Sequence, residues 1–263
     1  MTSGRNMQAA CREARAILAI KTLENIAKNP VLSESIIIQG GSAMRFGYSS
    51  PRFTNDIDFV TSQKLDKTGR DWVIGQLRDA APSMVENIPV QVRVKEVSEE
   101  MFRITFSMEL DRGSVAAIKL EGYCSAPPAT PSVKYQTQYG GVNVESPTEI
   151  IVDKIAANLD RIEKRGGIKS GDVFDIFFLT NAYTYKVTKQ MVMEKARCYG
   201  TELSSKDLKM RLGRILTYLN ENNEKIVKDI LNSLEPHYRE HFNTERMMQR
   251  TKKLLACLQG ERD

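Results

Sequence analysis

Two aspartates with one residue between them, Asp56 and Asp58, are the residues of this sequence best placed to do chemistry. They lie in the segment DIDFV, whose alternating residues predict a β-strand with both carboxylates on one face. Such a pair binds a hard divalent cation, Mg²⁺ or Mn²⁺, and Mg²⁺ commonly combines one or two carboxylates with substrate phosphates. The pair therefore predicts a metal-dependent site for a phosphate-bearing substrate.

A glycine turn precedes this strand and predicts a phosphate-binding loop. A β-branched run, Ser35 to Ile38, closes on Gly40-Gly41, and Ser42 is placed to cap a second short helix through Phe46. Backbone N–H groups at Gly41 and Ser42 would then face phosphate oxygens. The turn and the carboxylate strand together predict one site that holds a nucleotide and its metal ions.

The order of these motifs resembles the nucleotidyltransferase signature of the DNA polymerase β superfamily, in which a Gly-Ser turn is followed by Asp-x-Asp or Asp-x-Glu. Here 13 residues separate Ser42 from Asp56. The resemblance implies a third carboxylate from a nearby strand. We expect Glu121, in the alternating segment 115–123, to be this third metal ligand, with Asp111 as the second choice.

The loop between the glycine turn and the aspartates adds two arginines to the expected site. Family members more often have the order Arg-x-Ser/Thr-x-Asp-x-Asp, and Arg52-Phe53-Thr54-Asn55-Asp56 fits it with little strain. The resemblance implies that Arg52 and Arg45 contact phosphate. The alternative is that either is a solvated loop arginine.

Residues 146–179 resemble the second half of the AbiEii/AbiGii nucleotidyltransferase toxin family. That family pairs a helix carrying a lysine with a downstream Asp-x-x-Asp, and Lys154, Asp172 and Asp175 match these positions. On a helix, positions 172 and 175 lie on one face. The resemblance implies that Lys154 and Asp172 are catalytic and that Lys154 and Asp175 contact the nucleotide. The alternative is an amphipathic helix with ordinary surface ion pairs.

The elements that must position these residues predict an α/β (α+β) protein of two domains, 1–145 and 146–263. The first is predicted to be a mixed sheet with helices, for which the resemblance implies the nucleotidyltransferase fold, and a proline- and glycine-containing stretch precedes the boundary near Glu145. Its helices and strands are expected at residues 6–27, 65–80, 90–97, 102–108 and 115–123. The second is predicted to be a helical bundle, with helices at residues 147–164, 170–182, 188–199, 204–221, 222–234 and 237–259.

Composition and missing motifs exclude several other classes. No apolar run approaches the roughly 18 to 20 residues of a membrane-spanning helix, and the N-terminus has no secretory signal pattern, so we expect a cytoplasmic protein. The four cysteines form no CxxC pair, which argues against a disulfide framework and a structural zinc site. Neither a P-loop nor a GxGxxG motif is present, which argues against a kinase, an ATPase and a dehydrogenase. The net charge of +5 arises after residue 150, where 21 basic residues face 16 acidic ones.

The AbiEii resemblance implies the toxin of a bacterial toxin–antitoxin or abortive-infection system. Such an enzyme would transfer NMP from an NTP to an RNA such as tRNA, opposed by a separately encoded antitoxin protein. The basic second half agrees with an RNA acceptor. Two alternatives stay open: a small-molecule, antibiotic-type nucleotidyltransferase, whose acceptor pocket would be acidic, and a catalytically silent RNA- or partner-binding module.

Overall fold

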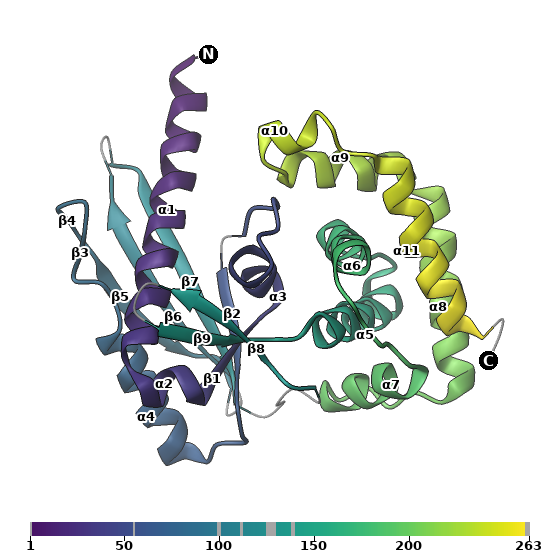
Figure 1. The fold of residues 1–263 in the computed structure, drawn as a ribbon, viewed down its shortest axis with the longest axis horizontal. Coiled ribbons are helices and arrows are strands. Elements are labelled where there is room, and N and C mark those ends of the chain that lie inside the picture. Colours follow the sequence, from purple (N-terminus) through teal and green to yellow (C-terminus); the bar gives the residue numbers. More distant parts are fainter. Residues whose placement is uncertain are drawn as a thin grey trace. The chain divides into compact units, whose positions relative to one another are not determined.

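The structure is a computed structural model that describes residues 2–54, 56–98, 101–110, 113–124, 130–137 and 140–260 (Figure 1). Asn55 and Asp111, which figured in the sequence predictions, lie outside these residues. The chain forms two compact units. The sheet unit comprises Met1–Gly47 and Thr54–Glu145, and the helical unit comprises Tyr48–Phe53 and Ser146–Asp263.

The sheet unit is built on a seven-stranded mixed sheet with the order β5-β6-β7-β2-β1-β9-β8. Two of its strand pairs, β1 with β9 and β2 with β7, are parallel, and the others are antiparallel. The strands are β1 (Ile36–Gln39), β2 (Asp56–Thr61), β5 (Gln91–Glu96), β6 (Met101–Glu109), β7 (Val115–Tyr123), β8 (Val133–Thr137) and β9 (Gly140–Val144). A separate short pair consists of β3 (Met84–Val85) and β4 (Ile88–Pro89).

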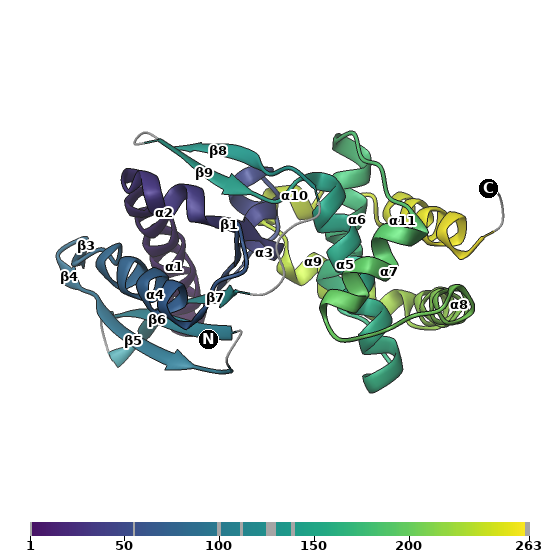
Figure 2. The ribbon, with the colours of Figure 1, turned by 90° about the horizontal axis from the view of Figure 1, so that it is seen from below.

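One face of this sheet is covered by α1 (Thr2–Lys28), α2 (Pro30–Ser35) and α4 (Lys67–Asp79), as Figures 1 and 2 show. Buried and partly exposed residues alternate along β6 and β7, as a strand with one covered face requires. Gly122 lies between the edge-to-face rings of Phe59 and Phe102, where a Cβ would come within 2.6 Å of either ring. The alternating residues of these strands thus place apolar side chains in a core on the covered face and polar side chains on the open face.

The glycine turn folds differently from the capped helix that we expected. Gly40–Ser42 forms a single helical turn, α3, and Ala43–Gly47 continues it as a π-helical turn. Ser42 lies inside this turn with a buried side chain, and its hydroxyl donates a hydrogen bond to the carbonyl oxygen of Asp56. The predicted N-cap role of Ser42 is therefore wrong, because the hydroxyl is used to hold the neighbouring strand.

The helical unit contains the helices that the 3.6-residue periodicity predicted, with one exception. They are α5 (Pro147–Arg165), α6 (Ser170–Ala182), α7 (Lys189–Cys198), α8 (Ser205–Glu221), α9 (Asn223–Ser233), α10 (Pro236–Arg239) and α11 (Thr244–Gln259). The single helix predicted over 237–259 is interrupted, because Asn243 caps α11 and Phe242 packs its ring against Phe174 and Phe177. No helix among the described residues is long and apolar enough to span a membrane.

A short piece of the loop between Ser42 and Asp56 belongs to the helical unit. The N–H of Phe53 donates to the carbonyl of Ser233 at 3.0 Å, and the N–H of Glu235 donates to the carbonyl of Pro51 at 3.0 Å. At the start of this piece, the ring of Tyr48 packs edge-to-face on Tyr183. The chain that enters β2 is thus anchored by backbone hydrogen bonds to the end of α9.

Candidate active site

The three predicted metal ligands come from two parallel strands in the middle of the sheet. Asp56 and Asp58 lie on β2 and Glu121 lies on β7, where Glu121 is the register partner of Asp58. Registered residues of adjacent strands point to the same side, so the three carboxylates share the open face. All three are partly exposed, while Ile57 and Leu120 between them are buried on the opposite face. Carboxylate oxygens on an open face form a donor set that fits Mg²⁺ or Mn²⁺.

Basic side chains from the same face lie beside these carboxylates. The Nε of Arg103 on β6 donates a 2.6 Å hydrogen bond to Oε1 of Glu121. The Nζ of Lys119 lies 4.0 Å from Oδ1 of Asp56, its register partner. Burial, together with the charges of Glu121 and Asp58, raises the pKa of Tyr123, the next residue on this face of β7. Positive charges from β6 and β7 thus lie beside the carboxylates of β2 and β7.

The glycine turn lies directly against the carboxylate of Asp58. Gly40 has a φ of +63°, and a Cβ at this position would come 2.9 Å from Oδ2 of Asp58. Only glycine adopts this backbone conformation without strain while leaving room for the carboxylate. Gly41 and Ser42 follow in the same turn, so the structure places the predicted phosphate loop next to a predicted metal ligand.

The helical unit brings together a second set of predicted residues. Lys154 on α5 is buried, and its Nζ donates to Oδ1 of Asp172 at 2.9 Å and lies 3.3 Å from Oδ2 of Asp175. Arg52 donates to both carboxylate oxygens of Asp175, and the Nη1 of Arg161 donates to Oδ2 of Asp172 at 2.6 Å. Three cations thus surround two buried carboxylates, which leaves one positive charge in excess.

Proton affinities in this cluster follow from the ion pairs. Burial alone would lower the pKa of Lys154, but the charges of Asp172 and Asp175 outweigh it and raise that pKa. Burial alone would raise the pKa of Asp172, but the charge of Lys154, followed by those of Lys169 and Arg161, holds it below the ordinary value. Lys154 and Asp172 therefore stabilise each other as charged groups.

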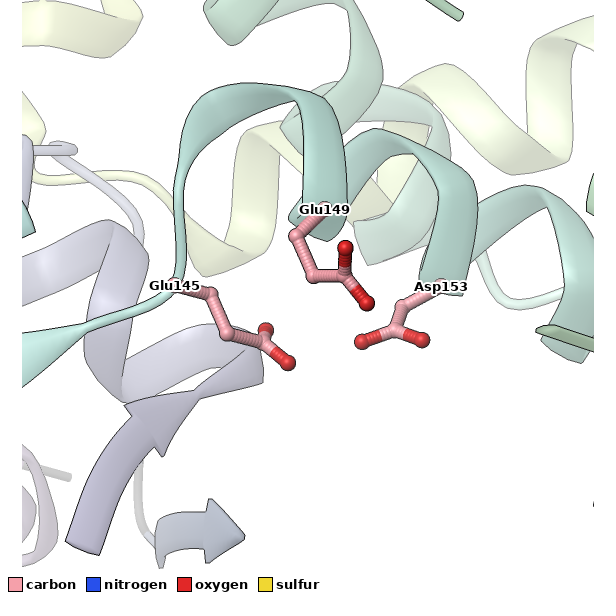
Figure 3. A group of neighbouring side chains, drawn as sticks. All are labelled: Glu145, Glu149 and Asp153. Carbon is pink, nitrogen blue, oxygen red and sulfur yellow. The ribbon is translucent and has the colours of Figure 1, made fainter. Parts of the chain in front are cut away.

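A third group of carboxylates was not singled out from the sequence. Glu145, Glu149 and Asp153 follow one another at intervals of four residues where α5 begins, with ligand oxygens within 4.8 Å of one another (Figure 3). Lys195 of α7 is buried and forms ion pairs with Glu149 and with Asp153, at 3.0 Å for the latter. This ammonium already occupies the position of a cation between two of the three carboxylates. The sequence indicates this group only through its four-residue spacing, because residues four apart on a helix lie on the same face.

A protein-family model described as the nucleotidyl transferase AbiEii toxin of type IV toxin–antitoxin systems matches residues 21–253. The chain belongs to this family. As an AbiEii protein it is a nucleotidyltransferase toxin, and the type IV system implies an NTP substrate and an antitoxin partner. No curated protein matches the chain.

Solved structures share the fold of this AbiEii protein. JHP933 from Helicobacter pylori superposes with a TM-score of 0.54 at 18% identity, covering 96% of this chain and 92% of its own. MenT4, a nucleotidyltransferase toxin from Mycobacterium tuberculosis H37Rv, gives 0.51 at 12% identity, covering 97% of each chain. A further H. pylori chain, assigned as a nucleotidyltransferase, gives 0.56 at 17%, covering 94% of each. The predicted fold class and family are confirmed.

The sequence did not predict the basic side chains that lie beside Glu121 and Asp56. Arg103 and Lys119 occupy alternating positions on predicted strands, where a solvated side chain is the ordinary interpretation. Only the pairing of β6 with β7, and of β7 with β2, places them beside Glu121 and Asp56. Arg52, predicted to contact phosphate, has its guanidinium on Asp175, and Arg45 lies in the π-helical turn.

Proposed function

We propose that this AbiEii nucleotidyltransferase transfers NMP from an NTP to an RNA such as tRNA, with Asp56, Asp58 and Glu121 as ligands of Mg²⁺ or Mn²⁺. The observation that carries the proposal is the register of Asp58 with Glu121, with the Gly40 turn against Asp58. Hard oxygen donors and a phosphate-binding turn then lie at one place.

In the proposed reaction the oxygen of an RNA hydroxyl attacks the α-phosphorus of the NTP. The bond from that phosphorus to its bridging oxygen breaks, pyrophosphate leaves, and the hydroxyl proton passes to Asp58 or Glu121. Backbone N–H groups of Gly41 and Ser42 hold phosphate oxygens, and Ser42 keeps this turn attached to β2 through Asp56. Divalent cations, when bound, neutralise the charge of the triphosphate and lower the pKa of the attacking hydroxyl.

The residues of the helical unit complete the proposal. Lys154 and Asp172 are proposed as catalytic, and Arg52, Lys154 and Asp175 as contacts of the nucleotide. Their cluster carries one positive charge in excess, which favours a polyphosphate ligand. Lys154 donates a hydrogen bond to Asp172 and forms an ion pair with Asp175, and its ammonium has three N–H donors, so a phosphate oxygen can accept from it as well.

The test is incubation of the purified protein with each α-labelled NTP, total cellular RNA and Mg²⁺, followed by gel separation. We expect label in an RNA band with wild type and none with Asp58→Ala. Asp71→Ala, which removes an exposed carboxylate on α4, is the matched control and should label as wild type does. Label that appears only on small molecules would contradict the RNA acceptor and leave the transferase assignment standing.

A further inference from the structure

Two rows of side chains cross four neighbouring strands on the open face of the sheet. Each aspartate of β2 has a register partner on β7, which in turn has one on β6 and then one on the edge strand β5. The rows are Asp58–Glu121–Arg103–Lys95 and Asp56–Lys119–Thr105–Arg93. Each begins at a predicted metal ligand and ends at a cation.

The cations along these rows are of two kinds. Arg103 and Lys119 lie beside the carboxylates of Glu121 and Asp56 and partly neutralise them. Arg93 and Lys95 are exposed on β5, and within the described part of the chain neither has an ion-pair partner. An unneutralised pair of cations on an edge strand protects that edge from pairing with other strands, and it also attracts polyanions.

The spacing of the rows suits an extended polyanion. Three strand separations of about 4.8 Å place β5 roughly 14 Å from the carboxylates of β2. Arg93 and Lys95, two residues apart, lie about 6.6 Å from each other along the strand. Single-stranded nucleic acids bind proteins along positively charged surfaces that follow their phosphates. A chain whose terminal hydroxyl lies at Asp56 and Asp58 would reach β5 with a phosphodiester farther along.

We infer that the acceptor RNA crosses the open face of the sheet from the carboxylates to β5, where Arg93 and Lys95 bind its phosphodiester groups. This inference rests on the proposed RNA acceptor and specifies its path. An acidic surface of the antitoxin is the rival occupant of the same two cations. RNA is favoured because the cations share their rows with the predicted metal ligands, which an acceptor must reach and an antitoxin need not.

The test compares two double variants that remove the same charge from opposite faces. Arg93→Gln/Lys95→Gln removes the cations of β5. Lys67→Gln/Arg78→Gln removes two exposed cations of α4, which covers the other face. Each is assayed for NMP transfer to full-length RNA and to a dinucleotide, which is too short to span the roughly 14 Å to β5.

We expect the β5 variant to raise KM for full-length RNA with little change in kcat. Each phosphate contact to a single strand contributes about 0.7 to the slope of log K against log salt. One such contact therefore makes the affinity at 0.1 M salt about fivefold higher, relative to its affinity at 1 M salt. Two lost contacts should therefore raise KM about 25-fold at 0.1 M and reduce the slope by about 1.4. Dinucleotide transfer should be unchanged, and the α4 variant should match wild type in both assays.

The outcomes separate this inference from the proposed function. If wild type labels RNA and the β5 variant keeps wild-type KM and salt slope, the path across β5 is wrong while the RNA acceptor stands. If wild type labels no RNA, the proposed acceptor itself fails. If the β5 variant transfers normally but is no longer inhibited by its antitoxin, the cations belong to the antitoxin interface and the inference is overturned.

Discussion

Arg52 donates two hydrogen bonds to the carboxylate of Asp175, from Nε to Oδ1 at 2.8 Å and from Nη2 to Oδ2 at 2.7 Å. The bidentate geometry is the one that a planar guanidinium forms best with a carboxylate. Asp175 is fully buried and Arg52 nearly so, so solvent screens this pair little. The pair fastens residues 48–53, which lead into β2, to helix α6.

Loss of this arginine should destabilise the protein strongly. Arg52→Met leaves Asp175 with only part of its compensating charge, and breaking a buried ion pair costs about 3–5 kcal/mol. The control is Arg214→Met, which removes an exposed ion pair with Glu163 and should cost about 0–1 kcal/mol. Urea unfolding followed by circular dichroism measures both. Equal losses in the two variants would show that the Arg52 pair is not a principal support of the fold.

The buried cluster should make the stability depend on acid pH. The pKa of Asp172 is lowered in the folded protein, so its contribution is present above the unfolded pKa of about 3.9 and is lost as the pH falls through the folded pKa. We expect the free energy of unfolding of wild type to fall below about pH 4. Asp172→Asn should lower stability at pH 7 and show a shallower fall in acid. Urea unfolding at pH 3, 4, 5 and 7 tests this, and parallel pH curves for the two proteins would contradict it.

Gly40 should be needed for activity because it leaves room for the carboxylate of Asp58, in addition to adopting a positive φ. Gly40→Ala imposes about 1–2 kcal/mol of strain at positive φ and places a methyl group against Asp58. Gly113→Ala is the matched control, since Gly113 also has a positive φ, +72°, with nothing within 4 Å of the added Cβ. Both variants should lose similar stability. Only Gly40→Ala should lose transfer, by about 100-fold in kcat/KM, because small displacements of catalytic groups are costly; equal activities would remove the turn from the site.

Metal binding should stabilise the folded protein through the sheet carboxylates. A cation at 100 times its dissociation constant contributes about 2.7 kcal/mol, so Mg²⁺ or Mn²⁺ should raise the melting temperature of wild type. Asp56→Ala should abolish this rise. Asp153→Asn, in the group that Lys195 already occupies, should retain it. Loss of the rise in Asp153→Asn alone would move the metal site to Glu145, Glu149 and Asp153.

Local patterns in the sequence were sufficient to predict most of the elements and the placement of Asp56 and Asp58, two of the three proposed metal ligands, on one strand. The alternation in DIDFV places Asp56 and Asp58 on one face of a strand whatever that strand pairs with, because side chains alternate along any strand. Periodicity and capping residues likewise predict helices such as α6, whose predicted bounds agree with the structure. The two-domain division and the roles of the site residues stay predictions.

Only the tertiary structure showed the strand pairings and buried ion pairs that join residues distant in the sequence. The parallel register of β2 with β7 places Glu121 beside Asp58 and starts the two rows that end at β5. The anchoring of residues 48–53 to the helical unit, through Arg52 and the end of α9, has no local signal either. Strand register and buried ion pairs are set by which surfaces meet when the chain packs, and a repeat of two or of 3.6 residues specifies a face without specifying its partner.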